Sequence, residues 1–291
     1  MVIGETIRNP RAPHRGRFIL MAVLIALGVL AGGSARAESS RVGHAPGLPR
    51  TDGLLRAVVR DGLVDYGLLE EQRHRLAMSL EEIAGMPPAR LAQLPARVRL
   101  AFYLNAYNAA TLDLVARERG KRGGRLTSIK EIPGAWSRPT WNVAGIKRTL
   151  DQIEHEIIRR EFHEPRIHMA LVCASISCPA LRPEAYGGVE LERQLEAASL
   201  AFVNDSTRNR FIPREGKIRI SKIFDWYGED FAGVYRDEEL EGLYGKKNGA
   251  VLAFAARYLP PETSAAWRAR RVPVEYLPYD WSLNAAPASA K

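Results

Sequence analysis

The stretch ARVRLAFYLNAYNAATLDLVARE, residues 96–118, predicts a buried helix on which the rest of the fold is built. Pro95 precedes this stretch and Gly120 follows it, as expected for the two ends of a helix. One set of its side chains recurs at intervals of three and four residues, a spacing that places them on one helical face: Leu100, Leu104, Tyr107, Thr111 and Leu114.

The stretches that follow alternate between helical and strand patterns. Residues 149–152 have the Thr-x-x-Gln form of a capping box, which predicts a helix through Ile153, Ile157 and Ile158. The run RIHMALVC, residues 166–173, is apolar on both alternating faces, which predicts a strand in the middle of a sheet. The remaining patterns predict helices over residues 191–202, 223–231 (capped by Ser221) and 250–259, and strands over residues 217–221 and 272–277.

These patterns together indicate the fold class. Helices outnumber strands and their order is mixed, so we expect an α+β fold: a single domain with helices packed around a small central mixed sheet. We expect this domain over residues 50–284, with a flexible segment over residues 38–49 and a disordered tail over residues 285–291. A chain of 291 residues with 46% hydrophobic content is long enough to bury such a core.

The N-terminus has the pattern of a secretory signal peptide. Four arginines precede the 13-residue apolar run of residues 18–30, and Ala35-Arg36-Ala37 forms a small-x-small cleavage site. The run is shorter than the roughly 20 residues of a membrane-spanning helix. We therefore expect a Sec-type signal peptide over residues 1–37, cleavage after Ala37, and a periplasmic or secreted protein without stable membrane insertion. An uncleaved anchor is the alternative.

The charge balance argues against a nucleic-acid partner. The chain has a net charge of +9, of which residues 1–37 contribute +4, so about +5 remains after cleavage. Basic clusters such as residues 117–122 have no aromatic residues interleaved with them. A modest positive charge on a mixed surface favours solubility rather than nucleic-acid binding.

The only two cysteines of the sequence, Cys173 and Cys178, lie five positions apart. An oxidising compartment favours a disulfide between them. Three alternatives stay open: a thiol nucleophile at Cys178, two inert buried thiols, and a metal site. With two cysteines and one histidine a zinc site would lack a ligand, so we expect no metal.

The position of His168 bears on these alternatives. In a strand, His168 and Cys173 would lie on opposite faces, about 16 Å apart at ~3.3 Å per residue. The small residues 174–177 allow a turn, and Pro179 favours an extended conformation of Cys178. We therefore expect the chain to double back, which would bring Cys178 close to Cys173 or to the face of His168.

Five stretches of the sequence resemble successive blocks of the bacterial domain of unknown function 547 family, over roughly residues 54–284. The family carries no assigned activity, so the resemblance implies no catalytic residues. The five stretches are AFYLNAYNAATL (101–112), TLDQIEHEII (149–158), IHMALVCASISCPALRPEAY (167–186), SKIFDWYGEDF (221–231) and YDWSLN (279–284).

Two functional hypotheses follow. The first is a thiol-dependent hydrolase or acyl/amide transferase acting on an envelope substrate. In this hypothesis Cys178 is the nucleophile, His168 the general base, and Asn105 or Asp280 the residue that orients the imidazole. Each of these polar residues also has a structural interpretation. Asn105 and Asn108 can hydrogen-bond backbone groups of a loop, and Asp280 can cap a turn.

The second hypothesis is a non-catalytic binding domain with a structural Cys173–Cys178 disulfide. Its candidate binding residues are Asn108, Trp226, Tyr227, Tyr279 and Trp281. The partner would be a small molecule or a peptide-like envelope ligand. No GxSxG, HExxH, P-loop or GxGxxG motif follows the signal peptide, so no cofactor is expected. The sequence leaves open whether the chain is an enzyme, what it binds and its oligomeric state.

Overall fold

The computed structural model describes residues 47–211 and 216–287. They belong to one compact unit, His44–Lys291. The predicted signal peptide and most of the predicted flexible segment lie outside the described residues. In chain order the elements are α1 (Pro49–Val58), β1 (Val59–Arg60), β2 (Leu63–Val64), α2 (Tyr66–Glu71), α3 (Arg73–Ala84), α4 (Pro88–Gln93), α5 (Ala96–Lys121), η1 (Ile129–Glu131), β3 (Trp141–Val143), β4 (Ile146–Arg148), η2 (Gln152–Ile158), α6 (Arg159–Phe162), η3 (Pro165–Met169), α7 (Leu191–Val203), β5 (Ile218–Ile220), α8 (Lys222–Ala232), α9 (Glu238–Tyr244), α10 (Lys246–Ala256), α11 (Pro261–Ala269) and β6 (Val274–Tyr276).

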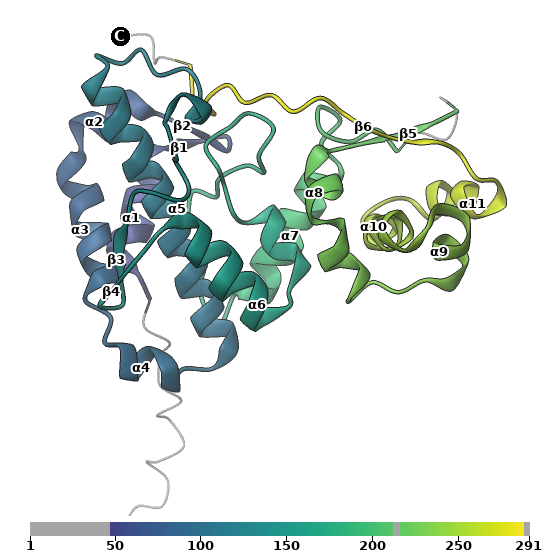
Figure 1. The fold of residues 1–291 in the computed structure, drawn as a ribbon, viewed down its shortest axis with the longest axis horizontal. Helices are drawn as coiled ribbons and strands as arrows, with labels where there is room; N and C mark the ends of the chain where they lie inside the picture. The colour runs from purple at the N-terminus through teal and green to yellow at the C-terminus, as the bar shows by residue number, and fades with distance from the viewer. Residues whose placement is uncertain (1–46, 212–215, 288–291) are drawn as a thin grey trace, which may run out of the picture. The chain divides into compact units, whose positions relative to one another are not determined.

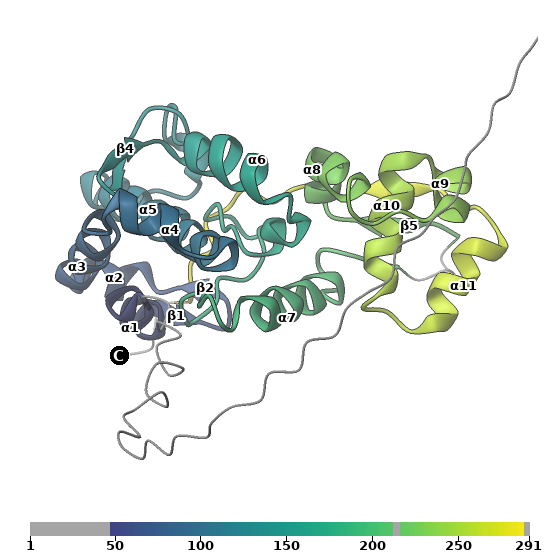
Figure 2. The same cartoon turned by 90° about the horizontal axis from the view of Figure 1, so that it is seen from below.

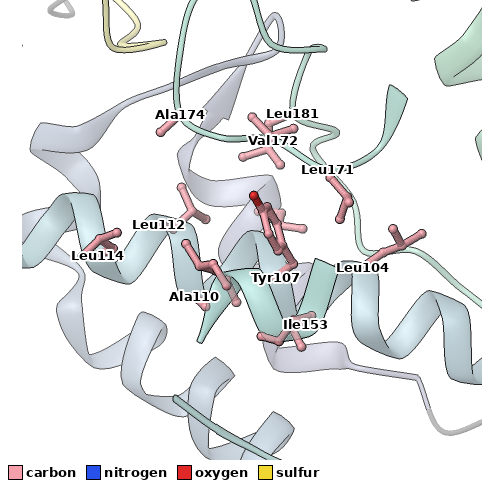
Figure 3. Close-up of a cluster of buried hydrophobic side chains, with 14 of the residues drawn as sticks. Leu104, Tyr107, Ala110, Leu112, Leu114, Ile153, Leu171, Val172, Ala174 and Leu181 are labelled. Atoms are coloured by element: carbon pink, nitrogen blue, oxygen red, sulfur yellow. The ribbon is translucent and has the colours of Figure 1, made fainter. Parts of the chain in front are cut away.

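The predicted buried helix is α5, which runs through the first of two hydrophobic cores (Figure 1). All five side chains of the predicted helical face are buried. Tyr107 lies between Ile153 of η2 and the loop that carries Leu171 and Val172 (Figure 3). Because α5 is buried on nearly all sides along its middle, it serves as the axis against which the other N-terminal elements pack.

The second core lies among α8, α9, α10 and α11. Phe224 and Phe231 of α8 pack against Phe254 of α10, with ring centroids 4.9 to 6.2 Å apart. The fully buried Trp267 of α11 joins them. Met169 of η3 also belongs to this core, so the segment around His168 lies where the two cores meet.

The α+β class is confirmed, but the strands do not form a central mixed sheet. They make three separate two-stranded sheets: β1–β2 and β3–β4 are antiparallel, and β5–β6 is parallel. The predicted strands over residues 217–221 and 272–277 are the parallel pair. The centre that we expected a sheet to occupy is taken by α5, since an all-round apolar helix can fill a core by itself.

The run over residues 166–173 is not a strand, which corrects the prediction. It begins as the 3-10 helix η3 and continues as an irregular loop. The predicted burial is confirmed for residues 166–172, and Cys173 is partly buried. Its backbone groups, however, are satisfied by a side chain: Asn108 donates to the Ala170 carbonyl (3.0 Å) and accepts from the Val172 N–H (3.0 Å). The Asn108 side chain thus makes the hydrogen bonds that a neighbouring strand would otherwise make.

The C-terminal segment returns from the second core to the first (Figures 1 and 2). Past β6 it forms isolated bridges from Ser282 to Ser128, from Leu283 to Ser175 and from Ala285 to Val64. Ala285, the first residue of the predicted tail, is therefore paired, and residues 288–291 lie outside the described part. This return places Tyr279 and Trp281 beside the loop of the two cysteines.

Several local predictions are confirmed. The capping box closes in both directions, since the Gln152 N–H donates to the Thr149 hydroxyl (3.1 Å) and the Thr149 N–H donates to the Gln152 side chain (3.0 Å). Ser221 caps α8 by accepting from the Ile223 N–H. Within the described ranges, no helix combines the length and the apolar character needed to cross a bilayer.

Candidate functional site

A cavity of 380 Å³ lies where the two cores meet. This volume falls within the range of small-molecule sites, roughly 300–1,000 Å³. Each of the five sequence stretches quoted above contributes to its wall, and Trp136 is the one described lining residue from outside them. The lining residues are Tyr107, Trp136, Asp151, Glu154, His155, His168, Leu171, Cys173, Cys178, Ile223, Trp226, Tyr227, Tyr279 and Trp281.

One wall of the cavity is a continuous aromatic cluster. The Tyr279 ring centroid lies 4.5 Å from that of Trp281 and 4.8 Å from that of Trp226. Trp136 extends the cluster, 6.2 Å from Trp281. Trp226 is exposed, at 43% of its full accessible area, so the cluster reaches solvent. Four adjacent rings offer apolar contact and negative π-faces to a ligand.

A second wall is acidic and comes from η2, a π-helix. Glu154 on η2 is buried, at 6% exposure, and Asp151 immediately precedes η2. Burial, followed by the nearby charge of Glu154, raises the pKa of Asp151 despite the opposing effect of His155. Burial and then the Glu154 carboxylate also raise the pKa of Tyr107 and that of Tyr227, which keeps both hydroxyls protonated. π-Helical turns of this kind occur frequently at functional sites.

A His168–Asp230–Arg159 array lies behind the cavity, with His168 buried and the other two side chains partly buried. His168 Nε2 is 2.7 Å from Asp230 Oδ2, and Arg159 binds both oxygens of Asp230 at 2.7 and 2.8 Å. Burial opposes ionisation of Asp230, but its hydrogen bonds from His168 and Arg159 prevail and hold its pKa well below the usual range. Because an ionised carboxylate only accepts, Nε2 of His168 must donate. Burial lowers the pKa of His168, so the imidazole is neutral at pH 7.

The His168 ring is stacked on Tyr227, with centroids 3.9 Å apart and planes inclined by 19°. The guanidinium carbon of Arg159 lies 5.1 Å from the centroid of the same Tyr227 ring. The residue that orients the imidazole is therefore Asp230, supported by Arg159, rather than Asn105 or Asp280. His168 itself lines the cavity, as both cysteines do.

Cys173 and Cys178 form a disulfide, with Cα atoms 6.2 Å apart. The chain doubles back as expected: Ala174 has a left-handed backbone (φ 61°), and the Cys178 N–H donates to the Ser175 carbonyl at 3.0 Å. Arg208 holds the loop by donating to the carbonyls of Ile176 and Cys178. The Tyr279 hydroxyl lies 3.2 Å from the Cys173 sulfur and 3.1 Å from the Cys178 sulfur.

Comparison with known families agrees with the resemblance seen in the sequence. Residues 91–203 match the model of a family described as "Protein of unknown function, DUF547". This segment is similar to the DUF547 family. The match covers less than half of the chain and includes three of the five quoted stretches. Neither the search of curated proteins nor that of solved structures gave a match.

The segment that matches the DUF547 model supplies only part of the cavity. It contributes Tyr107, the acidic wall, His168 and the two cysteines, whereas Ile223, Trp226, Tyr227, Tyr279 and Trp281 come from beyond residue 203. The aromatic wall therefore depends mainly on chain outside the matched segment, together with Trp136 from inside it.

The structure brings most of the predicted site residues together. Cys178, His168, Trp226, Tyr227, Tyr279 and Trp281 all line the cavity. Asn105 and Asn108 instead bind backbone: the Asn105 amide donates to the Tyr186 carbonyl and accepts from the Tyr186 N–H, both at 2.8 Å. Asp280 is exposed and accepts from the Ser282 N–H at 2.8 Å, which is the turn-capping interpretation.

Sequence reasoning missed Asp151, Glu154, Trp136 and Asp230. The first two occupy helix positions that look like ordinary solvated charges, and His155 beside them is indeed exposed. A weak signal was present, because Glu154 follows the buried Ile153 within one of the family-like stretches. Across the described ranges 47–211 and 216–287, no three His, Cys, Asp or Glu side chains are grouped as metal ligands.

Proposed function

We propose that this protein is an exported binding domain whose cavity takes an organic cation, such as a substituted ammonium group. The observation that carries the proposal is the composition of the cavity wall. It combines six Tyr and Trp side chains with two carboxylates, and neither lysine nor arginine is among the described residues that line it. Aromatic faces and carboxylates together are the chemistry that recognises such cations.

The electrostatics of the acidic wall support this ligand class. A buried carboxylate such as Glu154 needs a partner, because removing it from water without one is costly. Its neighbours are the hydroxyls of Tyr107 and Tyr227 and the His155 ring, whose Nδ1 is 4.0 Å away. The Arg159 guanidinium also attracts it, but this group does not line the cavity. A bound cation would add an opposite charge on the cavity side of Glu154. It would also relieve the repulsion between Asp151 and Glu154 that helps to raise the pKa of Asp151.

The state of the cysteines favours binding over thiol chemistry as the basal function. Thiol-dependent hydrolysis needs a thiolate, and the Cys178 sulfur is bonded to Cys173. The disulfide instead fixes a loop of the cavity wall, as the binding-domain hypothesis expects. The ligand cation can be carried by a small molecule or by a basic residue of a peptide-like envelope ligand.

Calorimetric titration of the purified chain with choline and with its neutral isostere 3,3-dimethylbutan-1-ol tests the proposal. The two molecules have nearly the same shape and differ in charge. We expect choline to bind at least about tenfold more tightly, because the isostere loses the attraction of both the aromatic faces and the carboxylates. Equal affinity for the two, or binding of neither choline nor a lysine-containing peptide, would refute an organic-cation site.

Export is the second part of the proposal. It is supported by the basic and apolar N-terminal pattern with its small-x-small site, and a disulfide is compatible with an oxidising compartment. N-terminal sequencing of the protein recovered from the extracytoplasmic fraction should give a chain that starts at or near Glu38. Recovery of the intact Met1 chain from the cytoplasm would contradict this part without affecting the ligand proposal.

A further inference from the structure

The Cys173–Cys178 disulfide lies in the wall of the cavity rather than in the interior of a core. The two ends of the bond differ in accessibility. Cys173 is only partly buried, whereas Cys178 is 2% exposed. Cys173 is therefore the more accessible of the two cysteines to a thiol that enters the cavity.

Three hydrogen-bond donors lie within reach of the Cys178 sulfur. The Cys173 backbone N–H lies 3.0 Å from it. The Tyr279 hydroxyl lies 3.1 Å from the Cys178 sulfur and 3.2 Å from the Cys173 sulfur, and the Ser175 hydroxyl lies 3.4 Å and 3.1 Å from the same two atoms. The backbone N–H is therefore the donor that distinguishes Cys178. Burial raises the pKa of Tyr279 to about 12, so this hydroxyl keeps its proton at neutral pH. A neutral disulfide sulfur is a weak hydrogen-bond acceptor and does not require three donors. A thiolate accepts stronger hydrogen bonds, so this arrangement of donors suits a thiolate at Cys178.

We propose that the Cys173–Cys178 disulfide is reactive and oxidises thiol compounds that enter the cavity, with Cys178 as the leaving group. The thiolate of the substrate attacks the Cys173 sulfur, the S–S bond breaks, and its electron pair stays on the Cys178 sulfur. A second substrate thiolate then attacks the substrate sulfur of the mixed disulfide and expels Cys173. The substrate leaves as a disulfide, and the two cysteines take up the two protons that the substrate thiols release.

This activity goes beyond cation binding and uses different atoms. The donors around the Cys178 sulfur stabilise the charge that develops there as the bond breaks, which speeds thiol–disulfide exchange because a more stable thiolate leaves faster. A disulfide that serves only to fix the loop would gain nothing from them. The same cavity supplies access for the attacking thiol, and its aromatic wall contacts the apolar part of that thiol.

The first test compares the folded oxidised chain with the same chain unfolded in guanidinium chloride. Each is treated with dithiothreitol, quenched with an alkylating reagent and analysed by mass spectrometry. A reactive disulfide should be reduced roughly tenfold or more faster in the folded state, because only the folded chain assembles the three donors. Slower reduction in the folded state identifies a shielded structural disulfide and overturns the proposal.

The second test locates the attacked sulfur. The folded chain is treated with reduced glutathione, quenched with acid, and the mixed disulfide is mapped by peptide mass spectrometry. The proposal requires the adduct on Cys173. An adduct on Cys178, or no adduct while dithiothreitol also fails to react, overturns it.

The third test removes single donors. Ser175→Ala and Tyr279→Phe should each slow reduction by roughly three- to tenfold, because each removes one hydrogen bond to the departing sulfur. Ser177→Ala is the matched control: its hydroxyl accepts from the Asp280 N–H and belongs to the same loop. Equal rates for all three variants would overturn the role of the donors. The reduction rates are measured without choline, so a failure of the cation proposal would not change how they are interpreted.

Discussion

Glu154→Gln is expected to lower the affinity for choline by about 10- to 100-fold. A hydrogen bond or contact that involves a buried charge contributes about 1.5–3 kcal/mol, and each 1.4 kcal/mol corresponds to a factor of ten. Glu154 is 6% exposed, so solvent screens its charge little. Glutamine keeps the shape of the side chain and can still hydrogen-bond Tyr107 and Tyr227. The substitution therefore removes the charge and leaves the wall in place.

The control for this prediction is Glu156→Gln, which removes the same charge from an exposed residue of the same helix. It should leave the affinity for choline within about a factor of two, because an exposed charge is screened by water and salt. Calorimetric titration of both variants, with circular dichroism to verify folding, gives the comparison. If the two variants bind choline alike, the acidic wall does not form the cation site.

Asn108→Ala is expected to destabilise the fold by about 2–5 kcal/mol. The Asn108 amide donates to the Ala170 carbonyl and accepts from the Val172 N–H, in a position that is 3% exposed. Alanine leaves both backbone groups buried without a partner, and each such group costs about 1–3 kcal/mol. The loop that carries the cysteines should also become less ordered, since this amide holds its first residues.

Urea unfolding of the variant and of the wild-type chain measures the difference. Asn204→Ala provides the matched control, because the Asn204 amide donates to the carbonyls of Leu200 and Tyr258 on the surface. Water can replace these bonds, so the control should change stability by about 0.5 kcal/mol or less. A loss at Asn108 no larger than the loss at Asn204 would show that the amide does not substitute for a strand at residues 170–172.

Local signals in the sequence predicted local structure well. The apolar spacing of residues 96–118 corresponds to α5, and the Thr149–Gln152 capping box and the Ser221 cap both form. These features succeed because they depend on residues within one or two helical turns of each other. The backbone reversal between Cys173 and Cys178 also followed from local composition, since small residues permit a tight turn.

The strand predicted at residues 166–173 failed for a reason that is not local. Two-sided burial is shared by central strands and by loops enclosed between two cores, so the apolar pattern fits both. What decided between them was the Asn108 side chain, 62 positions from Ala170, which satisfies the backbone in place of a strand. The error also separated His168 from the cysteines, which in fact line the same cavity.

The sequence by itself determined the helical framework, the α+β class, the family resemblance and the proximity of the two cysteines, because all of these depend on composition and short-range spacing. Only the tertiary structure decided which residues make the site. The return of residues 279–285 to the first core brings Tyr279 and Trp281 to the cysteine loop, and Asp230 reaches His168 from α8. Such contacts between distant residues arise from the packing of two cores, and neither periodicity nor motif spacing encodes them.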